Sequence, residues 1–113
     1  MSKVLGIDLG TGNSVVAIYE NGVAKVIENS EGAQTTPSVV NFADNNEILV
    51  GVTAKRKSTV EPANTTYEIK RLMGRQYSDS EVQSTINHVP YTIIKNENGD
   101  AAVKIQNKTY SPP

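Results

Sequence analysis

The chain has 113 residues, with 11 basic and 12 acidic side chains and a net charge of −1, so it offers no basic face for nucleic acid. It contains no cysteine, which excludes disulfides, thiolate metal sites and cysteine nucleophiles. Its apolar runs are shorter than the roughly 18 residues of a membrane span, and its start lacks the apolar core of a signal peptide. We therefore expect a soluble, cytoplasmic protein without membrane contacts.

The first 28 residues are predicted to form a β-meander. Val and Ile total 22 residues against 6 for Leu and Met together, so sheet should outweigh helix. The Asn21-Gly22 pair is typical of a tight hairpin turn. Strands are expected around residues 4–7, 14–18 and 23–28, and a polar loop should follow from residue 29 to residue 36.

A second, mixed α/β unit is predicted over residues 38–113, which leaves residues 1–37 as the first unit. Strands are expected at 38–42, 47–50, 91–95, 101–106 and 108–110. Helices are expected at three places: 53–59, a short amphipathic one over 67–73 capped by 64–66, and one that opens with a capping box at 78–81. Val82, Ile86 and Val89 should form the buried stripe of the last helix.

The turn between the first two strands has the composition of a phosphate-binding loop. Gly10 and Gly12 permit positive φ angles and a close backbone approach, and the amides of Thr11, Gly12 and Asn13 are candidates for an anion-binding nest. Asp8 at the end of the first strand would repel bare phosphate unless hydrated Mg²⁺ lay between them. The residues therefore suggest a metal–nucleotide ligand.

Better-known glycine motifs do not fit this turn. A dinucleotide fingerprint needs a third glycine where Val15 stands and a helix where strand-like residues follow, and a Walker loop needs a Gly-Lys-Ser/Thr ending. An ordinary hairpin with a glycine-rich loop stays open as the alternative on composition alone. His88 is the only histidine and has no neighbouring ligand type, so a metal or catalytic-triad role is not expected.

Four segments together resemble the start of the DnaK family, the seventy-kilodalton heat-shock chaperones. They keep the family's order and spacing over the whole chain: Gly6–Ser14, Glu28–Gly32, Thr35–Ser38 and Ile69–Arg75. The resemblance implies an actin-like, ribonuclease-H-like ATPase lobe, with a β-hairpin meander as the base and a small inserted α/β subdomain. It also implies a stress-response chaperone that uses ATP to assist protein folding.

The resemblance further implies the roles of individual residues. The hairpin at Gly10, Thr11, Gly12 and Asn13 would grip the β- and γ-phosphates of ATP, and Asp8 would hold Mg²⁺ through water. ADP is the other nucleotide that the resemblance implies. Lys70 would reach the γ-phosphate and the attacking water, where a cation offsets charge in the transition state. The implied partners are unfolded client peptides, a J-domain co-chaperone and a nucleotide exchange factor.

The chain departs from the family in two ways. Gly12 stands where the family usually carries a second threonine, so a hydroxyl is lost while the amide stays. The chain is also far shorter than a family member, so we expect a fragment with little ATPase activity of its own. Two rival interpretations are a small-molecule kinase of the actin-like superfamily and a non-catalytic interaction module on the same scaffold.

Overall fold

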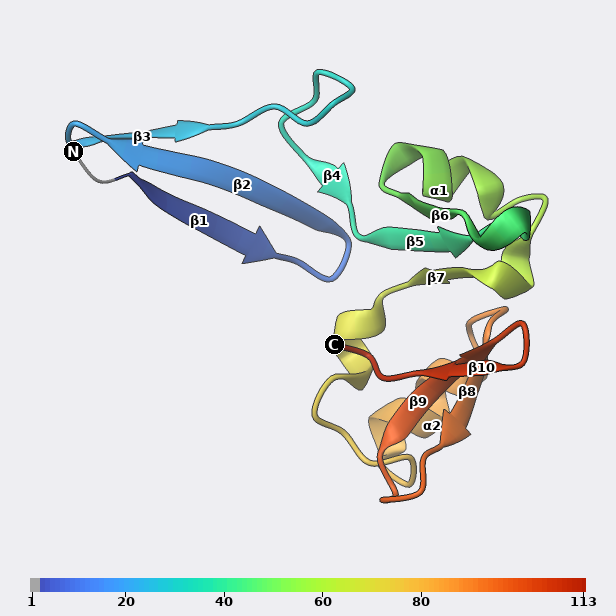
Figure 1. Ribbon diagram of the computed structural model, residues 1–113. Helices are drawn as coiled ribbons and strands as arrows, with labels where there is room; N and C mark the ends of the chain where they lie inside the picture. The colour runs from blue at the N-terminus through green and yellow to red at the C-terminus, as the bar shows by residue number, and fades with distance from the viewer. Residues whose placement is uncertain (1–2) are drawn as a thin grey trace.

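The computed structural model describes residues 3–113, which form three small antiparallel sheets and two short α-helices (Figure 1). The first sheet contains β1 (Val4–Leu9), β2 (Asn13–Glu20) and β3 (Val23–Val26), and β4 (Thr36–Pro37) pairs with the first residues of β2. Asn21 and Gly22 both have positive φ, as the predicted tight turn requires. The predicted β-meander is confirmed.

The second and third sheets belong to the rest of the chain. The second has the order β6 (Ile48–Val50), β5 (Val39–Phe42), β7 (Thr65–Tyr67), and α1 (Val52–Lys57) packs against it. The third is a meander of β8 (Thr92–Lys95), β9 (Ala101–Ile105) and β10 (Lys108–Tyr110) beside α2 (Ser80–Ile86). Three short 3₁₀ segments, Asp44–Asn46, Pro62–Asn64 and Ile69–Leu72, connect these elements. The predicted mixed α/β class is confirmed.

The hydrophobic core lies at the third sheet. Its seven members are each at most 7% exposed: Leu72, Val82, Tyr91, Ile93, Ala101, Val103 and Ile105. Ile86 and Val89 pack against this cluster, so the predicted stripe of the last helix faces the core. β1 differs from this buried cluster, because every residue of the strand is exposed.

Two local predictions are wrong. The segment 67–73 is not an amphipathic α-helix, because Thr65–Tyr67 pairs with β5 and only Ile69–Leu72 turns, as a 3₁₀ helix. The capping box is also wrong: the N-cap of α2 is Asp79, whose carboxylate accepts the Gln76 amide at 3.0 Å and makes no cap hydrogen bond to the helix. In the first place a long-range strand partner overrides the local pattern. In the second place the helix begins one residue later than the box requires, and the Asp79 carboxylate bonds the preceding turn at Gln76.

The change from the first sheet to the second coincides with the predicted unit boundary, since β4 ends at Pro37 and β5 begins at Val39. Whether 1–37 and 38–113 act as separate units stays a prediction. Within residues 3–113, every helix is too short to cross a bilayer.

Candidate functional site

The turn between β1 and β2 is built around a close backbone approach at Gly10. The last paired residues of the two strands are Leu9 and Ser14. A Cβ added at Gly10 would lie 2.2 Å from the carbonyl oxygen of Asn13, so no side chain fits there without a shift of the turn. The predicted close approach is therefore confirmed at this position.

The predicted positive φ angles are wrong for both glycines of the turn. The glycines of the described chain that adopt positive φ are Gly22, Gly32, Gly51, Gly74 and Gly99. Gly12 also has open space, because a Cβ added there meets no atom within 4 Å. A larger residue, such as the threonine that the family resemblance implies, is therefore compatible with the backbone at position 12.

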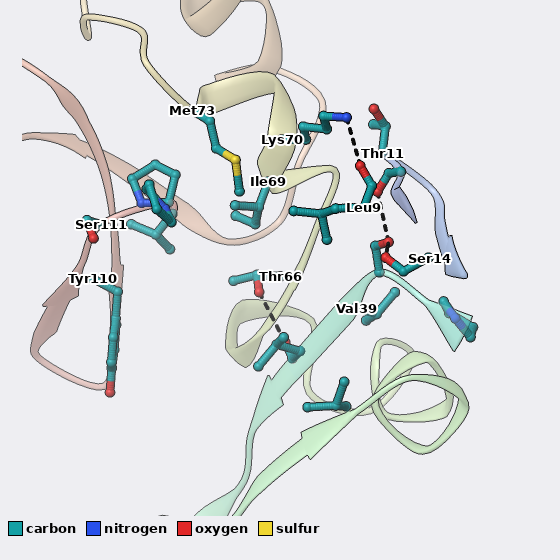
Figure 2. Close-up of a pocket in the computed structure, with 18 of the residues that line it drawn as sticks. Leu9, Thr11, Ser14, Val39, Thr66, Ile69, Lys70, Met73, Tyr110 and Ser111 are labelled. Atoms are coloured by element: carbon teal, nitrogen blue, oxygen red, sulfur yellow. Dashed lines mark hydrogen bonds between the residues drawn. The ribbon is translucent and has the colours of Figure 1, made fainter. Parts of the chain in front are cut away.

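Lys70 reaches this turn from the predicted second unit, residues 38–113. It lies in the 3₁₀ segment Ile69–Leu72, directly after Glu68 and Ile69. The left-handed φ of 55° at Glu68 changes the direction of the chain as it leaves β7. The Lys70 Nζ donates a hydrogen bond of 2.7 Å to the backbone carbonyl of Leu9, across 61 residues of sequence. Figure 2 shows the lysine side chain extended toward the end of β1, with this bond drawn as a dashed line.

Two cavities flank the turn. Gly10, Thr11 and Lys70 line the first, of about 400 Å³, together with apolar side chains of all three sheets (Figure 2). Thr11 and Gly12 line the second, of about 390 Å³, which also contains the polar side chains of Lys55 and Glu68. Thr11 lines both cavities, so the tip of the hairpin borders each of them.

Asp8 and Asn13 are the two predicted site residues that line neither cavity. Alternation along β1 directs the Asp8 side chain to the face opposite that of Leu9, which lines the first cavity. Both residues are exposed, and the ion pairs of residues 3–113 do not include Asp8. The structure thus brings Gly10, Thr11 and Lys70 to one cavity and leaves the Asp8 carboxylate without a cation.

Sequence reasoning missed Ser38 and Ser14. The Ser38 hydroxyl donates to the carbonyl of Gly10 at 2.8 Å, and the hydroxyls of Ser14 and Ser38 lie 2.9 Å apart. The only local signal was the Pro37-Ser38 step, where a proline without an N–H precedes a residue with two donors.

Comparison with known proteins identifies the family. The sequence model of the family described as Hsp70 protein matches residues 4–113. This chain belongs to the Hsp70 family. It is 55% identical over 113 residues to the chaperone protein DnaK of Carsonella ruddii (strain PV) and 54% identical over 113 residues to that of Burkholderia cenocepacia. All of the chain is covered in both cases, but it spans only 19% and 17% of the length of those relatives.

Membership of the Hsp70 family confirms the resemblance drawn from the four sequence segments. It agrees with the actin-like fold that the resemblance implied, as does the mixed α/β architecture of three small antiparallel sheets with few helices. It does not favour the rival interpretation as a small-molecule kinase or a non-catalytic module.

The side chains of this Hsp70 chain do not form a complete Mg²⁺ site of their own. They could hold the ion only together with water molecules or the phosphates of a nucleotide. Within residues 3–113, no three His, Cys, Asp or Glu side chains gather into a metal-binding group. Mg²⁺ keeps several waters and commonly uses one or two carboxylates plus the phosphates of a nucleotide. The exposed, unpaired carboxylate of Asp8 beside the turn meets this smaller requirement.

Proposed function

We propose that this chain supplies the first phosphate-binding hairpin, and the subdomain inserted after it, of an ATP-hydrolysing chaperone. The observation that carries the proposal is the hydrogen bond from Lys70 to Leu9, because it holds a cation beside a turn built for close backbone approach. In this proposal residues 1–37 form the lobe base and residues 38–113 the inserted subdomain.

The hairpin would hold the phosphates of ATP or ADP through backbone amides. The amides of Thr11 and Gly12 are not used by the hydrogen bonds found among residues 3–113, so they are available as donors to an anion. Gly10 keeps the turn tight, and Asn13 contributes a further amide at the start of β2. Asp8 would contact metal-bound water, and bound Mg²⁺ would offset the charge of the β- and γ-phosphate oxygens.

Lys70 would stabilise the transition state when water attacks the γ-phosphorus. An ammonium group has three donors, so Lys70 can keep its bond to the Leu9 carbonyl while a second N–H reaches a phosphate oxygen. The fixed cation then lies where negative charge concentrates as the phosphoryl group transfers. We propose that the longer protein works in the cytoplasm with client peptides, a J-domain co-chaperone and a nucleotide exchange factor.

Replacement of Lys70 tests this proposal in a longer protein that contains this sequence. We expect Lys70→Ala to lower single-turnover ATP hydrolysis by about 10²- to 10³-fold, with a smaller effect on nucleotide affinity, because the lysine acts mainly in the transition state. Arg71→Ala is the matched control, since Arg71 is an exposed neighbour whose guanidinium pairs with Glu68 at 3.0 Å. Equal hydrolysis rates for the two variants would refute the role of Lys70.

The isolated 113-residue chain is expected to show no appreciable ATP hydrolysis, because a single hairpin covers one side of the phosphates only. Metal-dependent turnover by the pure chain that Lys70→Ala removes would contradict this expectation.

A further inference from the structure

Ser38 contacts the phosphate-binding turn twice. It lies between β4 and β5, half-buried, and it lines both cavities that flank the turn. Its backbone N–H donates to the carbonyl of Gly12 at 2.9 Å, and its hydroxyl donates to the carbonyl of Gly10 at 2.8 Å. One residue thereby fixes the carbonyls of both glycines.

The direction of the hydroxyl bonds follows from the number of protons. Ser38 has one hydroxyl proton, and the Gly10 carbonyl can only accept it. The contact of 2.9 Å between the two serine hydroxyls is therefore donated by Ser14, which stands opposite Leu9 in the hairpin register. A relay of two hydrogen bonds runs from Ser14 through Ser38 to the turn.

The relay orients the amides on the other side of the turn. In a trans peptide the C=O of one residue and the N–H of the next point in opposite directions. Fixing the Gly10 carbonyl therefore directs the Thr11 N–H away from Ser38, and fixing the Gly12 carbonyl does the same for Asn13. The described peptides of the chain contain no cis bond, so this geometry holds here.

The pairing of β4 with β2 does not compete for the Asn13 amide. Asn13 stands opposite Pro37, and the bond from Ser38 N–H to the Gly12 carbonyl flanks this pair. An antiparallel pair flanked in this way is of the non-hydrogen-bonded type, so the two residues do not bond each other. Thr11 and Asn13 thus both present donors that the Ser38 side of the turn leaves available.

We propose that Ser38 is a positioning residue for the phosphate-binding turn, and that its hydroxyl preorders the Thr11 amide for an anion. This inference rests on the proposed nucleotide binding, and it adds a residue that does not itself contact the phosphate. Preordering matters because donors that are already aligned need not be reorganised when the anion binds.

The test compares four variants in a longer protein that contains this sequence: Ser38→Ala, Ser38→Thr, Ser14→Ala and Ser84→Ala. Ser38→Ala should weaken Mg-ADP binding by about tenfold, the size of one lost hydrogen bond of moderate strength. Ser38→Thr should restore affinity because it keeps the hydroxyl, and the cavities on both sides of Ser38 leave room for a methyl group. Ser14→Ala should have a smaller effect, because the bond from Ser38 to Gly10 survives. The control Ser84→Ala changes an exposed residue of α2, and should bind as the parent does.

A second measurement separates failure of the inference from failure of the proposed function. Hydrogen–deuterium exchange of the peptide that covers residues 8–14, without nucleotide, should be faster in Ser38→Ala than in Ser84→Ala. If the unmodified protein does not bind Mg-ADP, the proposed function fails, and the inference that rests on it falls as well. If the protein binds Mg-ADP but Ser38→Ala matches Ser84→Ala in both affinity and exchange, only the positioning role of Ser38 is refuted.

Discussion

The first sheet and the C-terminal unit, here residues 69–113 with α2 and the third sheet, are ordered by different forces. In β1 the apolar side chains Val4, Leu5, Ile7 and Leu9 are 48–66% exposed, although all six residues of the strand pair with β2. In the C-terminal unit the seven core residues are at most 7% exposed. Backbone pairing defines the first region, whereas burial of apolar surface stabilises the second.

Because of this difference, the residues that fix the binding turn are not the residues that stabilise the fold. The turn that we propose to hold phosphate is fixed by three polar groups from outside the hairpin: the Ser38 backbone N–H, the Ser38 hydroxyl and the Lys70 ammonium. The residues that stabilise the fold lie mainly around β8, β9 and α2. Substitutions in the two regions should therefore affect different measurements.

The largest contrast is expected from one leucine truncation in each region. Leu72→Ala removes a side chain that is 0% exposed and should destabilise the chain by about 2–5 kcal/mol, because it leaves a cavity in the core. Leu5→Ala removes the same atoms from a site that is 59% exposed and should cost at most about 0.5 kcal/mol. Urea denaturation of both variants measures the difference. Equal losses would mean that the two regions form one stabilising core.

The elements with local signals were predictable from the sequence. The Asn21-Gly22 turn and the β-branched runs on either side of it specify the meander, because both signals act over a few residues. The need for glycine at position 10 was also predictable, although its cause is contact with the Asn13 carbonyl and not a positive φ. Lys70 was a candidate through the family resemblance alone, since a lysine in a polar segment has no distinguishing local pattern.

The features that depend on long-range pairing were not predictable. The local pattern at Thr65–Tyr67 predicts the start of a helix. In the folded chain this segment pairs with β5 instead, because tertiary pairing overrides the local preference. Ser38 contacts Gly10 across 28 residues and Lys70 contacts Leu9 across 61 residues, so neither bond has a local sequence signal. The site is therefore assembled by contacts that only the folded chain creates.

A substitution at the turn should impair both nucleotide binding and stability. Gly10→Ala places a Cβ 2.2 Å from the Asn13 carbonyl oxygen, so the turn must shift at a cost of about 1–3 kcal/mol. We expect the affinity for Mg-ADP to fall at least about tenfold, since the amides of the turn move with it. Gly12→Ala is the matched control, because its Cβ meets no atom within 4 Å, and it should leave both affinity and stability nearly unchanged. Similar affinities for the two variants, measured by calorimetry, would contradict the proposed geometry of the turn.

The smallest expected effect concerns the bond that joins the C-terminal unit to the second sheet. The Tyr91 hydroxyl donates to the Tyr67 carbonyl at 2.6 Å, and the two rings meet edge to face with centroids 5.7 Å apart. Tyr91→Phe keeps the ring contact and should cost about 1 kcal/mol for the lost hydrogen bond. Tyr19→Phe, at a residue that is 52% exposed, is the control and should cost little.

The dependence of this difference on pH provides a sharper test. Burial raises the pKa of Tyr91 above its ordinary value of 10.0, and the negative charges of ionised Tyr67 and of Glu68 raise it further. The unfolded chain therefore releases the Tyr91 proton at a lower pH than the folded chain does. The contribution of Tyr91 to stability is complete below about pH 10 and decreases as the pH rises above that value, by up to about 1.4 kcal/mol per pH unit. Tyr91→Phe lacks this decrease, so its deficit relative to the parent, measured by urea denaturation, should shrink between about pH 9 and about pH 11. A deficit that stays constant over this range would show that the Tyr91 hydroxyl is not buried in the folded protein.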